Sequence, residues 1–108
     1  MTTIYKICGR DAWRRAEAAG AFRGNADDVR DGFIHFSAAD QLAGTLERHF
    51  AGQDDLVLVA VDADRLGAAL KWEPSRGGAL FPHLYGVLPM SAVVSVEPVP
   101  GASMGEES

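Results

Sequence analysis

The sequence predicts a single α/β domain with a mixed, curved sheet of about five or six strands and two main helices packed on it. Three observations support this prediction. The chain has 108 residues, the usual size of one domain. Apolar residues make up 47% of it, enough for a core, and strand-like segments alternate with segments of helical periodicity. We expect the domain to span residues 1–100, and residues 101–108, which lack apolar anchors, to form a disordered tail.

The N-terminal segments predict one strand, one helix and a loop. Ile4–Cys8 is apolar enough for a first strand. Asp11 is placed to cap a helix that runs through Ala19, and Gly20 supplies its end. Residues Phe22–Asp31 are rich in Asp, Gly and Asn, which predicts a loop.

A second strand and helix follow. Phe33–Phe36 is expected to be a strand. Ser37, with Asp40 three residues later, resembles a capping box. Apolar residues at helical spacing then continue to Phe50, and Gly52 supplies the stop.

The C-terminal half predicts three more strands. Leu56–Val61 is apolar on both faces, as in a buried central strand. Leu70–Glu73 is expected to be a short strand, followed by a mobile, glycine-rich loop over Pro74–Gly78. Val93–Val99 forms the last strand, and Pro98 places it at a sheet edge.

Charge and composition exclude several classes of function. The net charge of -5 argues against a nucleic-acid polymer as partner, because such binding needs a basic surface. No apolar run is long enough to cross a membrane, and the N-terminus lacks a signal-peptide pattern. The single cysteine, Cys8, excludes an internal disulfide and predicts a buried, inert thiol. The expected location is therefore the cytoplasm; the sequence does not identify a protein partner.

Two short stretches, residues 33–37 and 81–86, each place an aromatic ring, an imidazole and a hydroxyl on one face. In an extended chain alternate side chains share a face, so an apolar face lies behind each polar one. The side chains on these polar faces are Phe33, His35 and Ser37, and Phe81, His83 and Tyr85. We expect His35 and His83 to open onto one cavity, where an imidazole can act as acid, base or hydrogen-bond anchor. The alternative is that each histidine is a buried structural residue bonded to a backbone carbonyl.

Other candidate residues are less distinctive. Trp72 is expected to face the core or the cleft wall, with Lys71 and Glu73 on the opposite face. Glu73 is a candidate acid or base, and a surface ion pair is the alternative. Arg76 is a candidate to close over an anion, and a plain flexible loop is the alternative. His49 lies in the last turn of the second helix, which predicts a structural or exposed role, and the histidine spacing matches no metal-ligand pattern.

Four motifs together resemble the bacterial domain of unknown function 952. They are Ile4–Ile7, Gly32–Ser37, Lys71–Glu73 and Phe81–Gly86, and the resemblance extends from about Ile4 to Val99. The resemblance names a family without naming a reaction. That family looks like a distant, minimal relative of the ADP-ribosyltransferase fold, which splits NAD at its nicotinamide–ribose bond.

This resemblance implies roles for several residues. Lys6 takes the position of a residue that holds the dinucleotide, where relatives often show His. His35 and Ser37 lie on the strand that carries a Tyr or Ser in such folds. The segment His83–Tyr85 corresponds to the strand of the catalytic Glu but has no acid, so Glu73 would have to replace it. Related folds that process 2′-phosphorylated RNA ends use His and Arg without that Glu.

Taken together, these features predict a domain that binds a small anionic ligand, a nucleotide such as NAD or ADP-ribose. NAD is expected as a substrate, and no cofactor or metal is assigned. If the domain is an enzyme, it is a transferase or hydrolase acting on NAD-like or phosphorylated ligands. The alternative is a non-catalytic ligand-sensing or protein-interaction module. The expected roles are phosphate contact for Lys6 and Arg76, ring contact for Phe33, Phe81 and Tyr85, and acid–base chemistry for His35, His83 and Glu73. Ser37 is a further expected ligand-binding residue, and Lys71 is a basic residue near the expected cleft.

Overall fold

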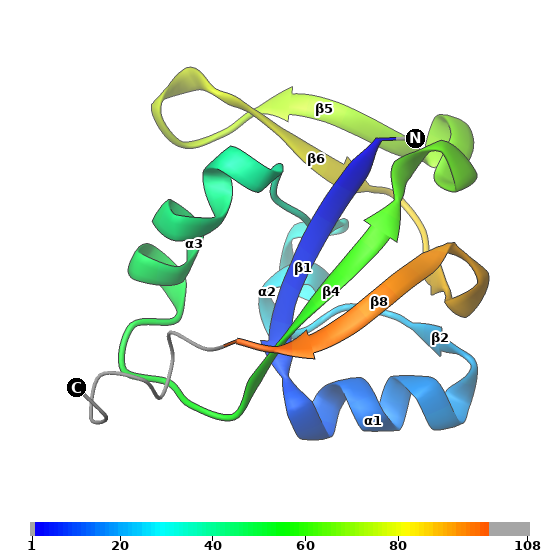
Figure 1. Cartoon of the computed structure of the whole chain (residues 1–108). Helices are drawn as coiled ribbons and strands as arrows, with labels where there is room; N and C mark the ends of the chain where they lie inside the picture. Colours follow the sequence, from blue (N-terminus) through cyan, green and yellow to red (C-terminus); the bar gives the residue numbers. More distant parts are fainter. Residues whose placement is uncertain (1, 100–108) are drawn as a thin grey trace.

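A computed structural model describes residues 2–99 of the chain, apart from the side chain of Arg76. It shows a small α+β domain in which the described strands form three separate antiparallel sheets (Figure 1). The predicted α+β class is confirmed, and the two predicted helices are present at Arg10–Ala19 and Leu42–His49. The prediction of one mixed sheet was wrong, because the strands pair in three antiparallel groups. The tail expected at residues 101–108 lies outside the described residues.

The first sheet has the order β1-β4-β8, with β1 at Thr3–Gly9, β4 at Leu56–Asp62 and β8 at Val93–Pro98. All of its pairs are antiparallel. The prediction that Leu56–Val61 forms a central buried strand is confirmed, since β4 lies between the other two strands and Val59 is fully buried. The predicted edge position of the last strand is also confirmed.

The two faces of this sheet pack against different helices. Alternate residues of β1 divide accordingly, with Ile4 and Cys8 in one core cluster and Ile7 in the other. The first cluster includes buried residues of α1, which spans Arg10–Ala19. The second packs against α3, which spans Leu42–His49. Burial of the Cys8 thiol, which raises its pKa to about 11, agrees with an inert residue.

Two predicted helix starts need correction. Helix α1 begins at Arg10 with Gly9 as its N-cap, so Asp11 lies in the first turn and caps nothing, although Gly20 ends the helix in the left-handed region as predicted. The expected capping box from Ser37 to Asp40 is absent. Instead the Gln41 side chain accepts a hydrogen bond from the Ala38 amide, because Ser37 is turned toward another partner.

The second three-stranded sheet has the order β3-β6-β5. Its strands are β3 at Ile34–His35, β6 at Leu80–Leu84 and β5 at Leu70–Pro74. In the β3–β6 pair, His35 lies directly opposite His83. An isolated bridge between Tyr5 and Ser37, with two hydrogen bonds of 2.8 Å, links this sheet to β1.

The segment predicted as a loop over Phe22–Asp31 contains a strand and a helix. Strand β2 (Ala21–Phe22) pairs with β7 (Leu88–Pro89). Helix α2 spans Ala26–Asp31. The Asn25 side chain accepts from the Asp28 amide, and the Asp28 carboxylate accepts from the Asn25 amide. This reciprocal capping starts a helix in a segment whose composition is typical of a loop.

The remaining segments are short turns. They are the 3-10 turns η1 (Ala39–Gln41), η2 (Ala63–Ala69), η3 (Arg76–Gly78) and η4 (Met90–Ala92). The expected burial of Trp72 is wrong, because 42% of this residue is exposed. No helix in the described part of the chain is long and apolar enough to cross a membrane.

Candidate functional site

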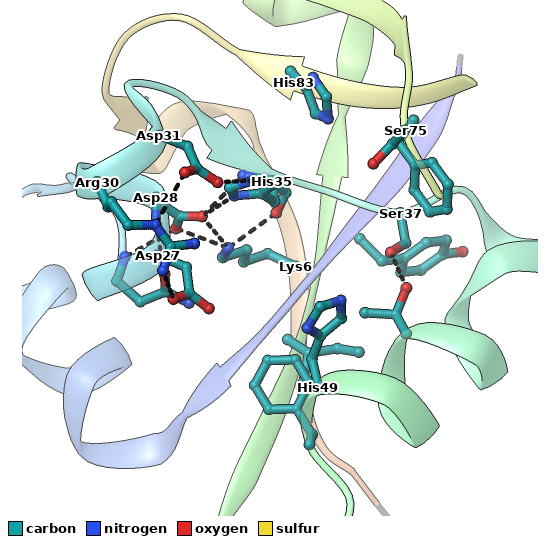
Figure 2. Close-up of a pocket in the computed structure, with 16 residues that line it drawn as sticks. Lys6, Asp27, Asp28, Arg30, Asp31, His35, Ser37, His49, Ser75 and His83 are labelled. Carbon is teal, nitrogen blue, oxygen red and sulfur yellow. Dashed lines mark hydrogen bonds and ion pairs between the residues drawn. The ribbon is translucent and has the colours of Figure 1, made fainter. Parts of the chain in front are cut away.

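A cavity of about 260 Å³ lies where β1, β3 and β6 meet helices α2 and α3 (Figure 2). Figure 2 shows His83 and His49 entering it from opposite walls. Both His35 and His83 line it, which confirms the prediction that they share one cavity. The lining residues are Tyr5, Lys6, Ile7, Asn25, Asp27, Asp28, Arg30, Asp31, His35, Ser37, Thr45, His49, Phe50, Ser75, Phe81 and His83.

His83 is oriented from behind by a carboxylate. Its Nδ1 atom lies 2.8 Å from Oε1 of Glu73, which also accepts a 2.7 Å hydrogen bond from the hydroxyl of Tyr85. The hydrogen bond to His83, and then that from Tyr85, hold the pKa of Glu73 below its usual value. Phe33 stacks on the imidazole at 4.1 Å between ring centroids. The ring is therefore held in one orientation.

The other ring nitrogen of His83 has no such partner. Within residues 2–99, its Nε2 atom is buried and makes no hydrogen bond. His83 is only 4% exposed and lines the cavity. A buried polar atom without a partner is costly in a folded protein. An unpaired nitrogen on a cavity wall is what a ligand-binding or proton-transfer group requires.

His35 has a different environment, although it lies opposite His83. Its Nδ1 atom is 2.6 Å from Oδ1 of Asp28, and its Nε2 atom is 3.0 Å from Oδ2 of Asp31. A carboxylate can only accept, so both bonds form together when the ring carries two protons. His35 thus closes one wall of the cavity with both nitrogens occupied.

Lys6 and Asp28 form a buried ion pair beside His35. The ammonium lies 2.8 Å from Oδ2 of Asp28 and donates to the His35 carbonyl at 2.9 Å. Burial alone would raise the pKa of Asp28, but the hydrogen bond from His35 and the charge of Lys6 outweigh it and hold that pKa at about 2. Burial lowers the pKa of Lys6, and Asp28 opposes that effect. The pair ties α2 to β1 and β3.

Ser37 and Thr45 form a second polar contact on the wall. Their hydroxyl oxygens are 2.8 Å apart, and Thr45 donates to the carbonyl of Gln41 at 3.1 Å. Ser37 is buried and lies two residues after the end of β3, where its backbone forms the bridge with Tyr5. The contact between Ser37 and Thr45 therefore joins α3 to the point where the two three-stranded sheets meet.

The structure brings together some of the predicted site residues and separates others. Three predicted residues lie behind His83 and do not line the cavity: Phe33, Tyr85 and Glu73. Glu73 therefore contacts the imidazole of His83 and does not face the cavity. Lys71 is exposed and outside the cavity wall, and the side chain of Arg76 lies outside the described part. The predicted residues that line the cavity are Lys6, His35, Ser37, Phe81 and His83.

Sequence reasoning missed several lining residues, Asp28 and Asp31 above all, because they were assigned to a loop. The spacing of Asn25 and Asp28 was the available signal for a capped helix. The position of Lys6 between Ile4 and Cys8 on one face of β1 was a signal for a buried, paired lysine. His49 was assigned no role in the site, yet it lines the cavity from an exposed position.

Metal binding finds no support in the described residues. No group of three or more His, Cys, Asp or Glu side chains in residues 2–99 is arranged to hold a metal ion.

Comparison with known proteins gives a family. A family model described as protein of unknown function, DUF952, matches residues 7–96. A crystal structure of protein CC0527 from Caulobacter crescentus superposes with a TM-score of 0.87 at 49% identity, covering 93% of this chain and 96% of that chain. A solution NMR structure of CC0527 gives 0.80 at 47% identity, covering 98% and 99%.

The search of curated proteins found no match. The family model matches well over half of the chain, and the two structures share its fold at nearly half identical sequence. The family predicted from the four sequence motifs is thereby confirmed, and the chain belongs to the DUF952 family of proteins of unknown function.

Proposed function

We propose that the cavity is an active site for a small, nucleoside-like molecule and that His83 is its proton acceptor. One observation carries this proposal. The Nε2 atom of His83 is buried, makes no hydrogen bond and lies in the cavity wall. A polar atom left in this state is satisfied when a ligand brings a proton donor to it.

Glu73 supports this role for His83. With Nδ1–H donated to Glu73, a neutral ring presents its lone pair at Nε2. When Nε2 takes a proton, the resulting imidazolium remains paired with the carboxylate. A carboxylate that fixes the tautomer and stabilises the protonated ring is the arrangement of known histidine bases.

The size and lining of the cavity favour a nucleoside-like ligand. Small-molecule pockets usually measure about 300–1,000 Å³, so about 260 Å³ suits one ring and one sugar better than a whole dinucleotide. The rings of Tyr5, Phe50 and Phe81 supply apolar wall, and hydroxyls and carboxylates supply hydrogen-bonding groups. NAD or ADP-ribose would enter with one nucleoside half.

The relationship to ADP-ribosyltransferases stays a hypothesis here, and the proposed reaction uses a histidine base where those enzymes use a catalytic Glu. Glu73 serves His83 in place of acting on a ligand. We propose an imidazole-based transfer or hydrolysis in which His83 removes a proton from water or from a ligand hydroxyl. That oxygen forms a bond to the reacting carbon while the bond from this carbon to the leaving group breaks, and His83 then gives the proton to the leaving group. A catalytic Glu of the transferase kind is not needed for that step.

Ligand binding and turnover test the proposal. Adenosine, nicotinamide riboside, NAD and ADP-ribose are titrated into the protein by calorimetry, and the reaction mixtures are analysed by chromatography. We expect saturable binding of at least one nucleoside compound, and turnover that falls about 100-fold or more in His83→Gln.

Tyr85→Phe is the matched control, because it removes a hydrogen bond to Glu73 and leaves the contact between Glu73 and His83. It should keep most of the activity. Binding without turnover would assign a ligand-sensing module. No binding by any of the four compounds, with His83→Gln indistinguishable from the natural protein, would contradict the proposal.

A further inference from the structure

The buried polar side chains of this domain gather at one place. Among residues 2–99 they are Lys6, Asp28, Ser37 and His83, and all four line the cavity. Two of them, Lys6 and Asp28, satisfy each other. The hydrogen-bonding state of the other two therefore decides what the deep wall of the cavity offers to a ligand.

The hydrogen bonds of Thr45 orient the proton of Ser37. A hydroxyl has one proton to donate, and Thr45 donates to the carbonyl of Gln41 at 3.1 Å. Either hydroxyl can donate in the 2.8 Å contact between Ser37 and Thr45, and while Thr45 donates to Gln41 the proton in that contact comes from Ser37. In this arrangement the Ser37 oxygen has lone pairs left, so Ser37 accepts from a ligand.

His83 presents the same polarity. Its Nδ1 proton is donated to the Glu73 carboxylate, so the neutral ring has an acceptor at Nε2. With the ring neutral, the two buried polar groups that remain available to a ligand, Ser37 and His83, both present acceptors. The hydroxyls of Tyr5 and Ser75 also line the cavity, but these residues are less buried and can turn either way.

The cations on the wall are engaged by protein groups. Lys6 contacts both carboxylate oxygens of Asp28 and the His35 carbonyl. Arg30 pairs with Asp27 and Asp31, and Asp31 also holds His35. A phosphate entering the cavity would have to displace one of these carboxylates and would lie near the others.

We infer that the group entering this cavity carries hydrogen-bond donors and no negative charge, such as the amino group or sugar hydroxyls of a neutral or cationic nucleoside. A phosphate attached to it stays outside. This inference rests on the proposed function and deepens it, and it replaces the small anion expected from the sequence. Ser37 is then a specificity-determining residue of the site.

Two matched pairs of compounds test the inference by calorimetry: adenosine against its 5′-monophosphate, and nicotinamide riboside against its 5′-monophosphate. We expect each nucleoside to bind at least as tightly as its phosphate. Ser37→Ala should weaken nucleoside binding about 3- to 10-fold, because the ligand donor loses its acceptor.

Thr45→Val provides a second variant that leaves Ser37 in place. It frees the Ser37 proton, so it should reduce the preference for the nucleoside over its phosphate. Circular dichroism confirms that each variant is folded.

Two outcomes overturn the inference in distinguishable ways. If the phosphates bind tenfold tighter than the nucleosides, or if Ser37→Ala and Thr45→Val leave both affinities unchanged, the donor requirement is wrong. The role of His83 stands in that case whenever His83→Gln still abolishes turnover. If neither these nucleosides and monophosphates nor NAD and ADP-ribose bind, the proposed function fails and this inference fails with it.

Discussion

His35 and His83 occupy equivalent positions in one strand pair and have opposite environments. They are register partners in the β3–β6 ladder, and their ring centroids lie 5.5 Å apart. His35 has a carboxylate on each ring nitrogen, whereas His83 has a carboxylate on one and no hydrogen-bond partner on the other within the described part of the chain. The two residues have the same type and equivalent strand positions. The difference in their hydrogen bonding therefore comes from the neighbouring elements, which are α2 beside His35 and β5 beside His83.

This comparison separates a histidine whose two ring nitrogens are both bonded within the fold from one whose Nε2 atom is available to the ligand that we propose. The neighbours of His35 use both of its nitrogens to hold three elements together. The neighbours of His83 orient the ring and leave one nitrogen for something outside the protein. A buried polar atom without a protein partner lowers stability, so it is a better indicator of function than the presence of a histidine.

The largest effect is expected for Asp28→Asn, which removes the charge that Lys6 and His35 share. It leaves a buried ammonium without its partner, and breaking such a pair costs about 3–5 kcal/mol of unfolding free energy. Urea denaturation measures the loss. Asp27→Asn is the control, because its pair with Arg30 is exposed and screened by solvent, so its loss should change the free energy of unfolding far less. Equal losses in the two variants would contradict the structural role of this network.

Acid should weaken the same network. The pKa of Asp28 is about 2 in the folded protein, below the usual value of 3.8, so its contribution is complete above the unfolded value and is lost as the pH falls toward 2. The shift corresponds to about 2 kcal/mol. Urea titrations at pH 5 and pH 2 should show a larger loss for the natural protein than for Asp28→Asn. The same loss in both would place the acid sensitivity elsewhere.

Substitution of each histidine by Gln sharpens the comparison itself. His35→Gln leaves Asp28 buried with one donor fewer, a loss of about 1–3 kcal/mol. His83→Gln takes a hydrogen bond from Glu73, which can bond to water instead because it is partly exposed. Its loss of unfolding free energy should therefore be about 1 kcal/mol smaller than that of the His35 variant. Chemical denaturation of both variants gives the difference. A reversed order would mean that His83 is the structural residue.

The smallest effect is expected for Tyr85→Phe. Tyr85 is half-exposed, and its hydroxyl contributes one hydrogen bond to Glu73, so its loss should change the free energy of unfolding less than any substitution above. That bond helps to lower the pKa of Glu73, so its removal should raise this pKa toward the usual value. Titration of the carboxyl carbon by NMR measures the change. An unchanged pKa would show that His83 alone holds the carboxylate.

The sequence predicted the parts of the fold that depend on local pattern. Hydrophobic runs located β1, β4 and β8, and alternation within two stretches placed His35 and His83 on one cavity. Strand alternation is a property of the backbone, so it survives without knowledge of the partner strand.

The rest depends on contacts that local pattern does not contain. Helix α2 has six residues and is defined by capping rather than by an apolar stripe, so its composition was typical of a loop. Asp28 reaches Lys6, 22 residues away, and His35. Glu73 faces His83 because of the register of β5 on β6, which alternation alone does not determine.

The Tyr5–Ser37 bridge has a consequence for motion. Two amide hydrogen bonds form this bridge between the three-stranded sheets, Lys6 adds a bond from β1 to the His35 carbonyl, and the cavity lies beside them. Because the bridge itself has only two hydrogen bonds, it can open locally while both sheets stay folded. The amide protons of Tyr5 and Ser37 should then exchange with solvent deuterium as a pair, faster than those in the centre of β4. A ligand that contacts both β1 and α3 would slow that exchange, so the exchange rate of these two amides would measure whether the cavity is filled.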